Sequence, residues 1–241
     1  MRLKAWGETD VGLKRAINQD SILLDNELGL FVVADGMGGH KGGEVASAIA
    51  VNTAKDVLLQ EVVSRTLSPR DVILKIYREA SARIFHKSSI ENPDLEGMGT
   101  TMVLAFYSGG TIYVGNVGDS RCYLYRDRNL WQLTEDHSLV NEQLKAGVIS
   151  EEEIGLITGR NVITRSVGYE RDVRVDVFQR ELISGENLLL CSDGLCGQVS
   201  DALIEDVCRK NKGKNIVTQC VSEAKKAGGD DNISVIYIEV E

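Results

Sequence analysis

The sequence predicts an α+β domain in which helices cover a β-sheet or β-sandwich. Two observations carry this prediction: short apolar segments typical of strands dominate the chain, and helical segments interrupt them in pairs. The length of 241 residues allows one large domain or two small ones. Because no internal repeat or low-complexity linker divides the chain, we expect a single domain over residues 1–241.

Eight short apolar segments are predicted to be strands. They cover residues 21–24, 30–34, 100–107, 111–117, 122–126, 173–178, 188–191 and 233–240. Short turns, such as those at 108–110 and 127–129, separate several of them and predict antiparallel hairpins. Valines alternate with charged residues from 173 to 177, so that strand is expected to have one solvent-exposed face.

Four segments have the periodicity of helices, namely 44–63, 69–87, 201–210 and 215–227. The first carries a stripe of small apolar residues from Ala46 to Leu58. The second begins with Ser68 as an N-cap and Pro69 at the first helical position. Residues 138–168 are polar and only partly helical, so we expect a mobile insertion there.

Charge and composition disfavour several classes of binding partner and metal. The formal net charge of −9 disfavours nucleic acids and anionic membranes, because both require a basic surface. Five cysteines without a C-x-x-C pair, together with three histidines, disfavour a zinc centre and indicate free thiols in a reducing compartment. Since no signal peptide or membrane-spanning run is apparent, we expect a cytoplasmic protein.

Acidic residues stand beside glycine at the ends of predicted strands. Asp35 follows the strand 30–34 and precedes five glycines within eight residues. No phosphate-loop signature is present, whereas the Asp35 carboxylate and the Gly36 carbonyl are suitable oxygen ligands for a metal ion. From this segment alone, a plain glycine turn before a helix is an equal alternative.

The same pattern recurs at Asp119, at Asp193 and at the pair Asp230 and Asp231. A single such aspartate is usually a turn former, but four at strand ends favour a common site. If they converge, their like charges require cations between them, and oxygen ligands select Mg²⁺ or Mn²⁺. Arg15 is a candidate phosphate ligand, although a lone arginine is normally a solvated surface group.

An ordered set of motifs extends over nearly the whole chain. They are R-x-x-N-x-D-S at 15–21, D-G-M-G-G-H at 35–40, G-T-T at 99–101, G-D-S-R at 118–121, D-H-S at 136–138, S-D-G at 192–194 and D-N at 231–232. In this set the sequence resembles the metal-dependent protein phosphatases of the type 2C class, in their compact bacterial branch. Each motif alone is weak, but the ordered set is specific.

The resemblance implies a central antiparallel β-sandwich flanked on both sides by helix pairs, with a flap at about 138–168. It implies a Mg²⁺- or Mn²⁺-dependent serine/threonine protein phosphatase. In that mechanism a metal-activated water attacks phosphorus in line, without a covalent phosphoenzyme. Two ions would share Asp35, the Gly36 carbonyl would bind one of them, and Asp193 and Asp231 would complete the set. A third ion would bind Asp119 together with Asp193.

Other roles are also implied by the resemblance. Arg15 would hold the phosphoryl oxygens. At the position of Gln19 many members have a glutamate that acts as an outer-sphere metal partner. At the position of Met37 many eukaryotic members have a histidine. His40 is then the candidate general acid, with a role in tethering the glycine turn as the alternative. Asp20 is expected behind the metal ligands, and His137 is expected to position the flap.

The resemblance also implies the partners. We expect a monomer that acts on phosphorylated proteins, namely the substrates of a bacterial serine/threonine kinase and the kinase itself. Two other functions stay open. A non-catalytic regulator on the same fold should lack the metal-bridging carboxylates, which are present here. A hydrolase of small phosphoesters would need no residue that this chain lacks.

Overall fold

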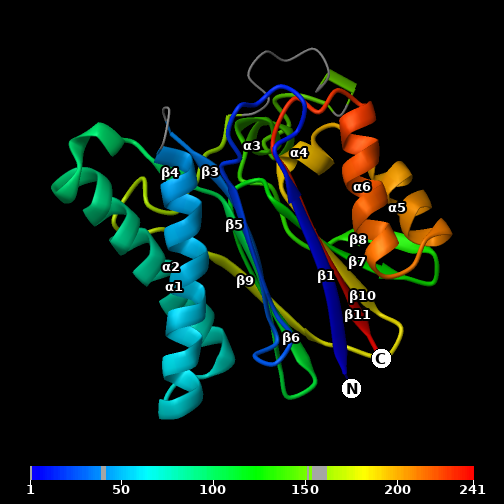
Figure 1. Cartoon of the computed structure of the whole chain (residues 1–241), viewed down its shortest axis with the longest axis horizontal. Helices are drawn as coiled ribbons and strands as arrows, with labels where there is room; N and C mark the ends of the chain where they lie inside the picture. The colour runs from blue at the N-terminus through cyan, green and yellow to red at the C-terminus, as the bar shows by residue number, and fades with distance from the viewer. Residues whose placement is uncertain (1, 39–41, 151, 154–161) are drawn as a thin grey trace.

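Two antiparallel sheets pack face to face and are covered on each outer side by a pair of helices (Figure 1). A computed structural model describes residues 2–38, 42–150, 152–153 and 162–241. The five-stranded sheet has the order β1 (Leu3–Asp10), β11 (Ile233–Val240), β10 (Asn187–Cys191), β7 (Arg121–Arg126) and β8 (Asn129–Gln132). The six-stranded sheet has the order β2 (Asp20–Asp25), β3 (Leu30–Met37), β5 (Met102–Ser108), β6 (Thr111–Val117) and β9 (Asp176–Glu181), with β4 (Gly99–Thr100) paired to β3.

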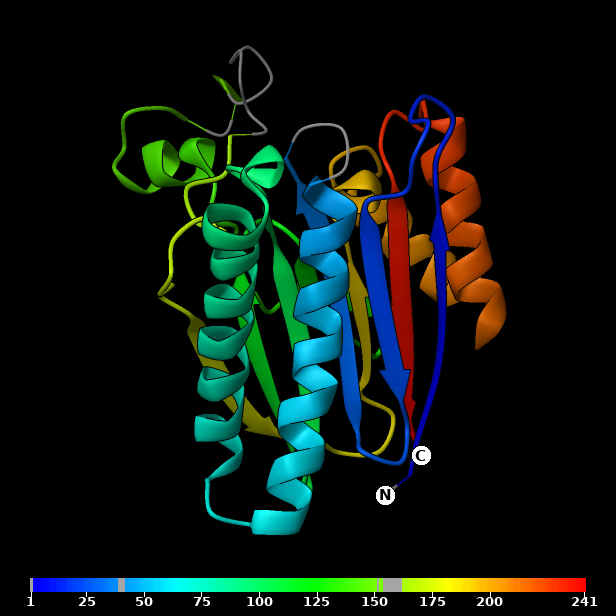
Figure 2. The ribbon, with the colours of Figure 1, turned by 60° about the vertical axis from the view of Figure 1, so that its left-hand side comes forward.

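The helices form two separate layers. In Figure 2 the long helices α1 and α2 lie side by side over the six-stranded sheet. The helices are α1 (Gly42–Ser64), α2 (Pro69–His86), α3 (Leu139–Lys145), α4 (Asp193–Cys196), α5 (Asp201–Lys210) and α6 (Lys214–Lys226), with a π-helical turn η1 (Lys87–Glu91) and a 3₁₀ turn η2 (Pro93–Leu95). The predicted sandwich with flanking helix pairs is therefore confirmed. None of the described helices combines the length and apolar character needed to cross a bilayer.

Side chains along the central strands point alternately to opposite faces of each sheet, and together they form three apolar layers. In β3, Leu30, Val32 and Ala34 pack under α1 and α2, whereas Phe31 and Val33 pack between the sheets. The third layer joins the five-stranded sheet to α5 and α6. Strands with both faces buried are apolar at every position, which explains why they are visible as continuous apolar runs.

Helix α2 is fixed by its first turn and by a buried tyrosine. The Ser68 hydroxyl accepts a hydrogen bond from the Asp71 amide at 3.2 Å, which confirms the predicted N-cap. Further along, the Tyr77 hydroxyl donates to the Met102 carbonyl at 2.9 Å. A Cβ atom on Gly115 would lie 2.7 Å from the Tyr77 ring, so glycine allows α2 to lie close over β6.

Two strand predictions need correction, and two strands were not predicted. The strand expected at 173–178 begins at Asp176, because Asn116, next to the end of β6, is the last β6 residue that pairs with β9, while Val173 and Val175 pack on the helix side without pairing. The strand expected at 100–107 is divided at Thr101, whose backbone amide bonds to the Asp35 carbonyl. The edge strands β1 and β8 were not predicted, since their residues are only half-buried or exposed and show little apolar patterning.

The predicted insertion at 138–168 contains α3 and closes at its base. Ser138 and Ile163 form an antiparallel bridge, and the Thr164 amide donates to the His137 carbonyl at 2.8 Å. Residues 151 and 154–161, and with them most of the predicted flap tip, lie outside the described residues.

Replacing Tyr77 by phenylalanine should destabilise the fold by about 1–2 kcal/mol, because the buried Met102 carbonyl loses a donor. Urea unfolding measures this as a lower midpoint at an unchanged slope. The matched control is Tyr169→Phe, since Tyr169 is exposed and should tolerate the change within about 0.5 kcal/mol. Equal midpoints for the Tyr77 variant and the wild type would contradict this role of the hydroxyl.

Candidate functional site

Loops at one end of the sandwich enclose a cavity of about 330 Å³. Asp35 lies near the end of β3 and Asp119 follows β6, both in the six-stranded sheet. Asp193 follows β10 and Asp231 precedes β11, both in the five-stranded sheet. The cavity therefore lies where the two sheets meet. It is lined by Arg15, Gln19, Asp35, Gly36, Met37, Gly38, Thr101, Asp119, Ile163, Asp193, Asp231 and Asn232.

The cavity brings together every predicted site residue except one. Arg15, Gln19, Asp35, Gly36, Asp119, Asp193 and Asp231 all line it. His40 lies in the segment 39–41, outside the described residues, so its role stays a prediction.

The two threonines of the G-T-T motif hold the backbone of Asp35. The Asp35 amide donates to Thr101 Oγ1 at 3.1 Å, and Thr100 Oγ1 donates to the Asp35 carbonyl at 2.8 Å. Thr101 Oγ1 also lies 2.7 Å from Ser120 Oγ, which ties this strand to the loop that carries Asp119. These bonds leave the Asp35 carboxylate free to face the cavity.

Gly36 is confined by backbone on both sides. Its amide donates to the Gln19 carbonyl at 3.1 Å, and the Ser47 hydroxyl donates to the same carbonyl at 2.6 Å. A Cβ atom on Gly36 would lie 2.0 Å from the Gly43 carbonyl oxygen. Only glycine fits this position.

Asn232 organises the loop that carries Arg15. Its Nδ2 donates to the carbonyls of Val11 and Ile17, both at 3.0 Å, and its Oδ1 accepts from the Gln19 amide at 2.7 Å. Arg15 itself is half exposed and pairs with Asp231 at 2.7 Å. No role was predicted for Asn232, and the only signal in the sequence is its position directly after Asp231.

His137 supports the loop before Asp119. Its Nδ1 accepts from the Gly118 amide at 3.1 Å, and its Nε2 lies 3.1 Å from Asp176 Oδ2. Burial lowers the pKa of His137, with a partial offset from Asp176. An acceptor at Nδ1 places the proton of the neutral ring on Nε2, facing Asp176. His137 therefore positions the Asp119 loop as well as the base of the predicted flap.

Burial and mutual repulsion disfavour the charged forms of the clustered carboxyls. Burial, with the nearby Asp193 and Asp231, raises the pKa of Asp20 to about 7. Burial, with Asp193 and Asp136, raises the pKa of Asp119 to about 7. The pKa of Asp35 is raised well above its ordinary value, and the pKa of Asp193 is raised as well, chiefly by burial.

The donor set fits hard divalent cations. Asp35 and Asp193 both line the cavity, and the neighbouring Asp193 contributes to the raised pKa of Asp35, so a cation between the two carboxylates would relieve an unfavourable pairing. Asp20 Oδ1 and Asp193 Oδ1 are buried without a hydrogen-bond partner among the described residues. As arranged here, no three acidic, histidine or cysteine side chains of the described chain close around a single point.

Comparisons with known proteins agree on one family. The family model described as "Protein phosphatase 2C" matches residues 14–232. The serine/threonine phosphatase stp of Listeria welshimeri is 38% identical over 96% of this chain and 93% of its own. The Mycobacterium tuberculosis serine/threonine phosphatase PstP/Ppp superposes with a TM-score of 0.93 at 32% identity, over 100% of both chains.

A second solved structure is the catalytic domain of the serine/threonine protein phosphatase PstP in complex with two manganese ions. It has a TM-score of 0.87 at 31% identity and covers 99% of this chain and 98% of its own.

When a chelator removes divalent cations, the free energy of unfolding should fall as the pH rises from about 4 to 7. Asp20 and Asp119 have folded-state pKa values of about 7 against an ordinary 3.8, so the folded state binds more protons in this window and loses them as the pH rises. Saturating Mn²⁺ should oppose this loss of stability and raise the melting temperature at pH 7 by about 5–10 °C.

Asp193→Asn should raise the melting temperature of the chelated protein at pH 7, since it removes one like charge, and should also reduce the Mn²⁺-induced rise. Asp127→Asn, at an exposed hairpin position, is the matched control and should change neither quantity. A wild-type protein whose melting temperature did not respond to Mn²⁺ would contradict a metal-binding cluster.

Proposed function

This chain belongs to the protein phosphatase 2C family, and from that premise we propose that it removes phosphate from phosphoserine and phosphothreonine in proteins with the help of Mg²⁺ or Mn²⁺. The observation that carries the proposal is the convergence of Asp35, Asp119, Asp193 and Asp231 with Arg15 around one cavity. The substrates would be proteins phosphorylated by a bacterial serine/threonine kinase, and the kinase itself.

The chain would act as one catalytic domain over residues 1–241, with the flap at about 138–168. Two observations support this proposal. The family match extends over residues 14–232, and β1 at the start of the chain pairs along its whole length with β11 at the end. The carboxylates of the cavity likewise come from both sheets.

Specific residues would hold the ions. Asp35, the Gly36 carbonyl, Asp193 and Asp231 are the proposed ligands of two ions, and Gln19 would act in the outer sphere. A third ion would be held by Asp119 and Asp193, which line both the catalytic cavity and an adjoining cavity of about 410 Å³. When bound, the ions would supply Lewis acidity, which acidifies water and offsets charge on phosphoryl oxygens.

The protein's own groups would position the substrate. Arg15 stands at the rim of the cavity, and its planar guanidinium can donate two parallel hydrogen bonds to phosphoryl oxygens. Asn232 holds the loop that presents it, and Asp231 pairs with the guanidinium itself. His40 is the proposed proton donor to the departing serine or threonine oxygen, which is a poor leaving group without a proton.

Hydrolysis of an aryl phosphate and of a phosphothreonine peptide, each with Mn²⁺ and with chelator, tests the function. We expect Mn²⁺-dependent hydrolysis of both substrates, and loss of both activities in Asp35→Asn but not in the control Asp127→Asn. Hydrolysis of the aryl phosphate without any hydrolysis of phosphopeptides would favour a small-molecule phosphoesterase. Phosphopeptide binding without turnover of either substrate would indicate a non-catalytic regulator.

Arg15→Ala should lower kcat/KM for the aryl phosphate by about ten- to a few hundredfold, because a charge-assisted hydrogen bond contributes about 1.5–3 kcal/mol. Arg15→Lys should recover only part of the loss, since a single ammonium cannot replace the planar fork. The neighbouring Lys14→Ala is the control for charge alone. Full activity in Arg15→Ala would assign Arg15 to the solvated surface.

A further inference from the structure

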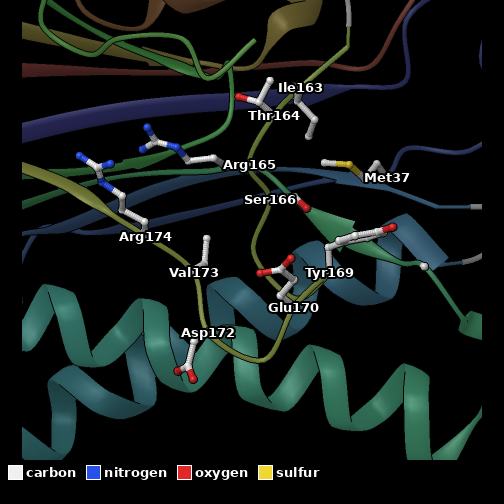
Figure 3. Close-up of a pocket in the computed structure, with 11 residues that line it drawn as sticks. Met37, Ile163, Thr164, Arg165, Ser166, Tyr169, Glu170, Asp172, Val173 and Arg174 are labelled. Carbon is white, nitrogen blue, oxygen red and sulfur yellow. The ribbon is translucent and has the colours of Figure 1, made fainter. Parts of the chain in front are cut away.

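A second cavity of about 620 Å³ opens beside the catalytic one (Figure 3). Most of its wall is the segment that returns from the predicted flap, from Ile163 to Arg174. Met37 and Ile163 line both cavities. The two cavities therefore form a continuous surface, and we refer to the second one as the return-segment groove.

The wall of this groove is anchored to the core. Val167 forms an antiparallel bridge with Thr100, the residue that holds Asp35. The Gly168 amide donates to Ser81 Oγ at 2.9 Å, and Ser81 Oγ donates to the Glu170 carbonyl at 2.7 Å. The groove is thus a fixed surface next to the site.

Two arginines and two acidic residues line the groove, on different sides. Arg165 is held by Asp176 at 3.0 Å and lies 3.1 Å from His137 Nε2. Arg174 is exposed and takes no part in that ion pair. In Figure 3 both guanidinium groups point to the same side, away from the carboxylates of Glu170 and Asp172. The lining therefore has no net charge, but Arg174 places an exposed positive charge on one side of the groove.

We propose that the return-segment groove binds the polypeptide next to the phosphorylated residue, and that Arg174 selects an acidic side chain there. The inference rests on the proposed function, since a phosphoryl group on a protein reaches the cavity only if its neighbouring residues lie on the adjoining surface. Exposed Tyr169 and partly buried Ile163 offer apolar contacts for that polypeptide. The positive charge of Arg174 is complementary to a carboxylate.

A panel of phosphothreonine peptides, each with a single glutamate at one flanking position, tests this directly. The comparison is kcat/KM for each peptide against the same peptide with glutamine. For at least one position, the wild type should prefer glutamate by about two- to fivefold, the range for an exposed charge pair. The preference should decrease at high ionic strength.

Arg174→Gln should abolish this preference, and Arg174→Glu should reverse it in favour of a peptide with lysine at the same position. Arg171→Gln is the matched control. This substitution removes the same charge from the same segment, but Arg171 lines a different cavity, against α2. It should keep the preference of the wild type.

Turnover of all peptides at equal rates, or an unchanged preference in Arg174→Glu, would overturn the role of Arg174 and leave the phosphatase function intact. Absence of turnover for every phosphopeptide, with hydrolysis of the aryl phosphate, would overturn the proposed function together with the groove. A reversal of preference in Arg174→Glu excludes misfolding as the explanation.

Discussion

Repulsion among carboxylates in one partly buried cavity is the constraint on which the rest of this structure depends. Burial away from water, together with the nearby like charges, raises the pKa values of Asp20, Asp35, Asp119 and Asp193. Such a cluster lowers the stability of the cation-free fold at neutral pH, so the surrounding structure must hold it in place.

The hydrogen bonds around the cavity supply that restraint mainly through the backbone. Thr100 and Thr101 bind the backbone of Asp35, Asn232 binds the loop of Arg15, and His137 binds the amide before Asp119. Because these bonds use backbone groups, they leave the Asp35 and Asp119 carboxylates available to cations. The polar residues of the motifs thus act chiefly as supports for a few acidic side chains.

The cavity also depends on how the two sheets pack. Asp35 lies in β3 and Asp119 follows β6 of the six-stranded sheet, whereas Asp193 follows β10 and Asp231 precedes β11 of the five-stranded sheet. The apolar layer between the sheets, which includes Phe31 and Val33, therefore sets the distance between the two halves of the site. Close-packed interiors have low compressibility, so the packing of the two sheets fixes the relative positions of the clustered carboxylates.

Much of the fold and of the cluster was predictable from the sequence, for physical reasons. Central strands buried on both faces are apolar throughout, and close backbone approach at Gly36 requires glycine, so the D-G motifs mark strand ends. By contrast, the edge strand β1 and the start of β9 at Asp176 depend on which neighbour offers pairing groups, and local composition does not contain that information.

The sequence by itself determined which side chains could form the site, since oxygen ligands beside glycine at strand ends are a local pattern. Only the tertiary structure decided that Asp231 pairs with Arg15, that Asn232 holds the Arg15 loop, and that Arg174 faces a groove while Arg171 faces α2. Each of these relations joins loops that are distant in the chain, and their geometry follows from the packing of the two sheets and their helices.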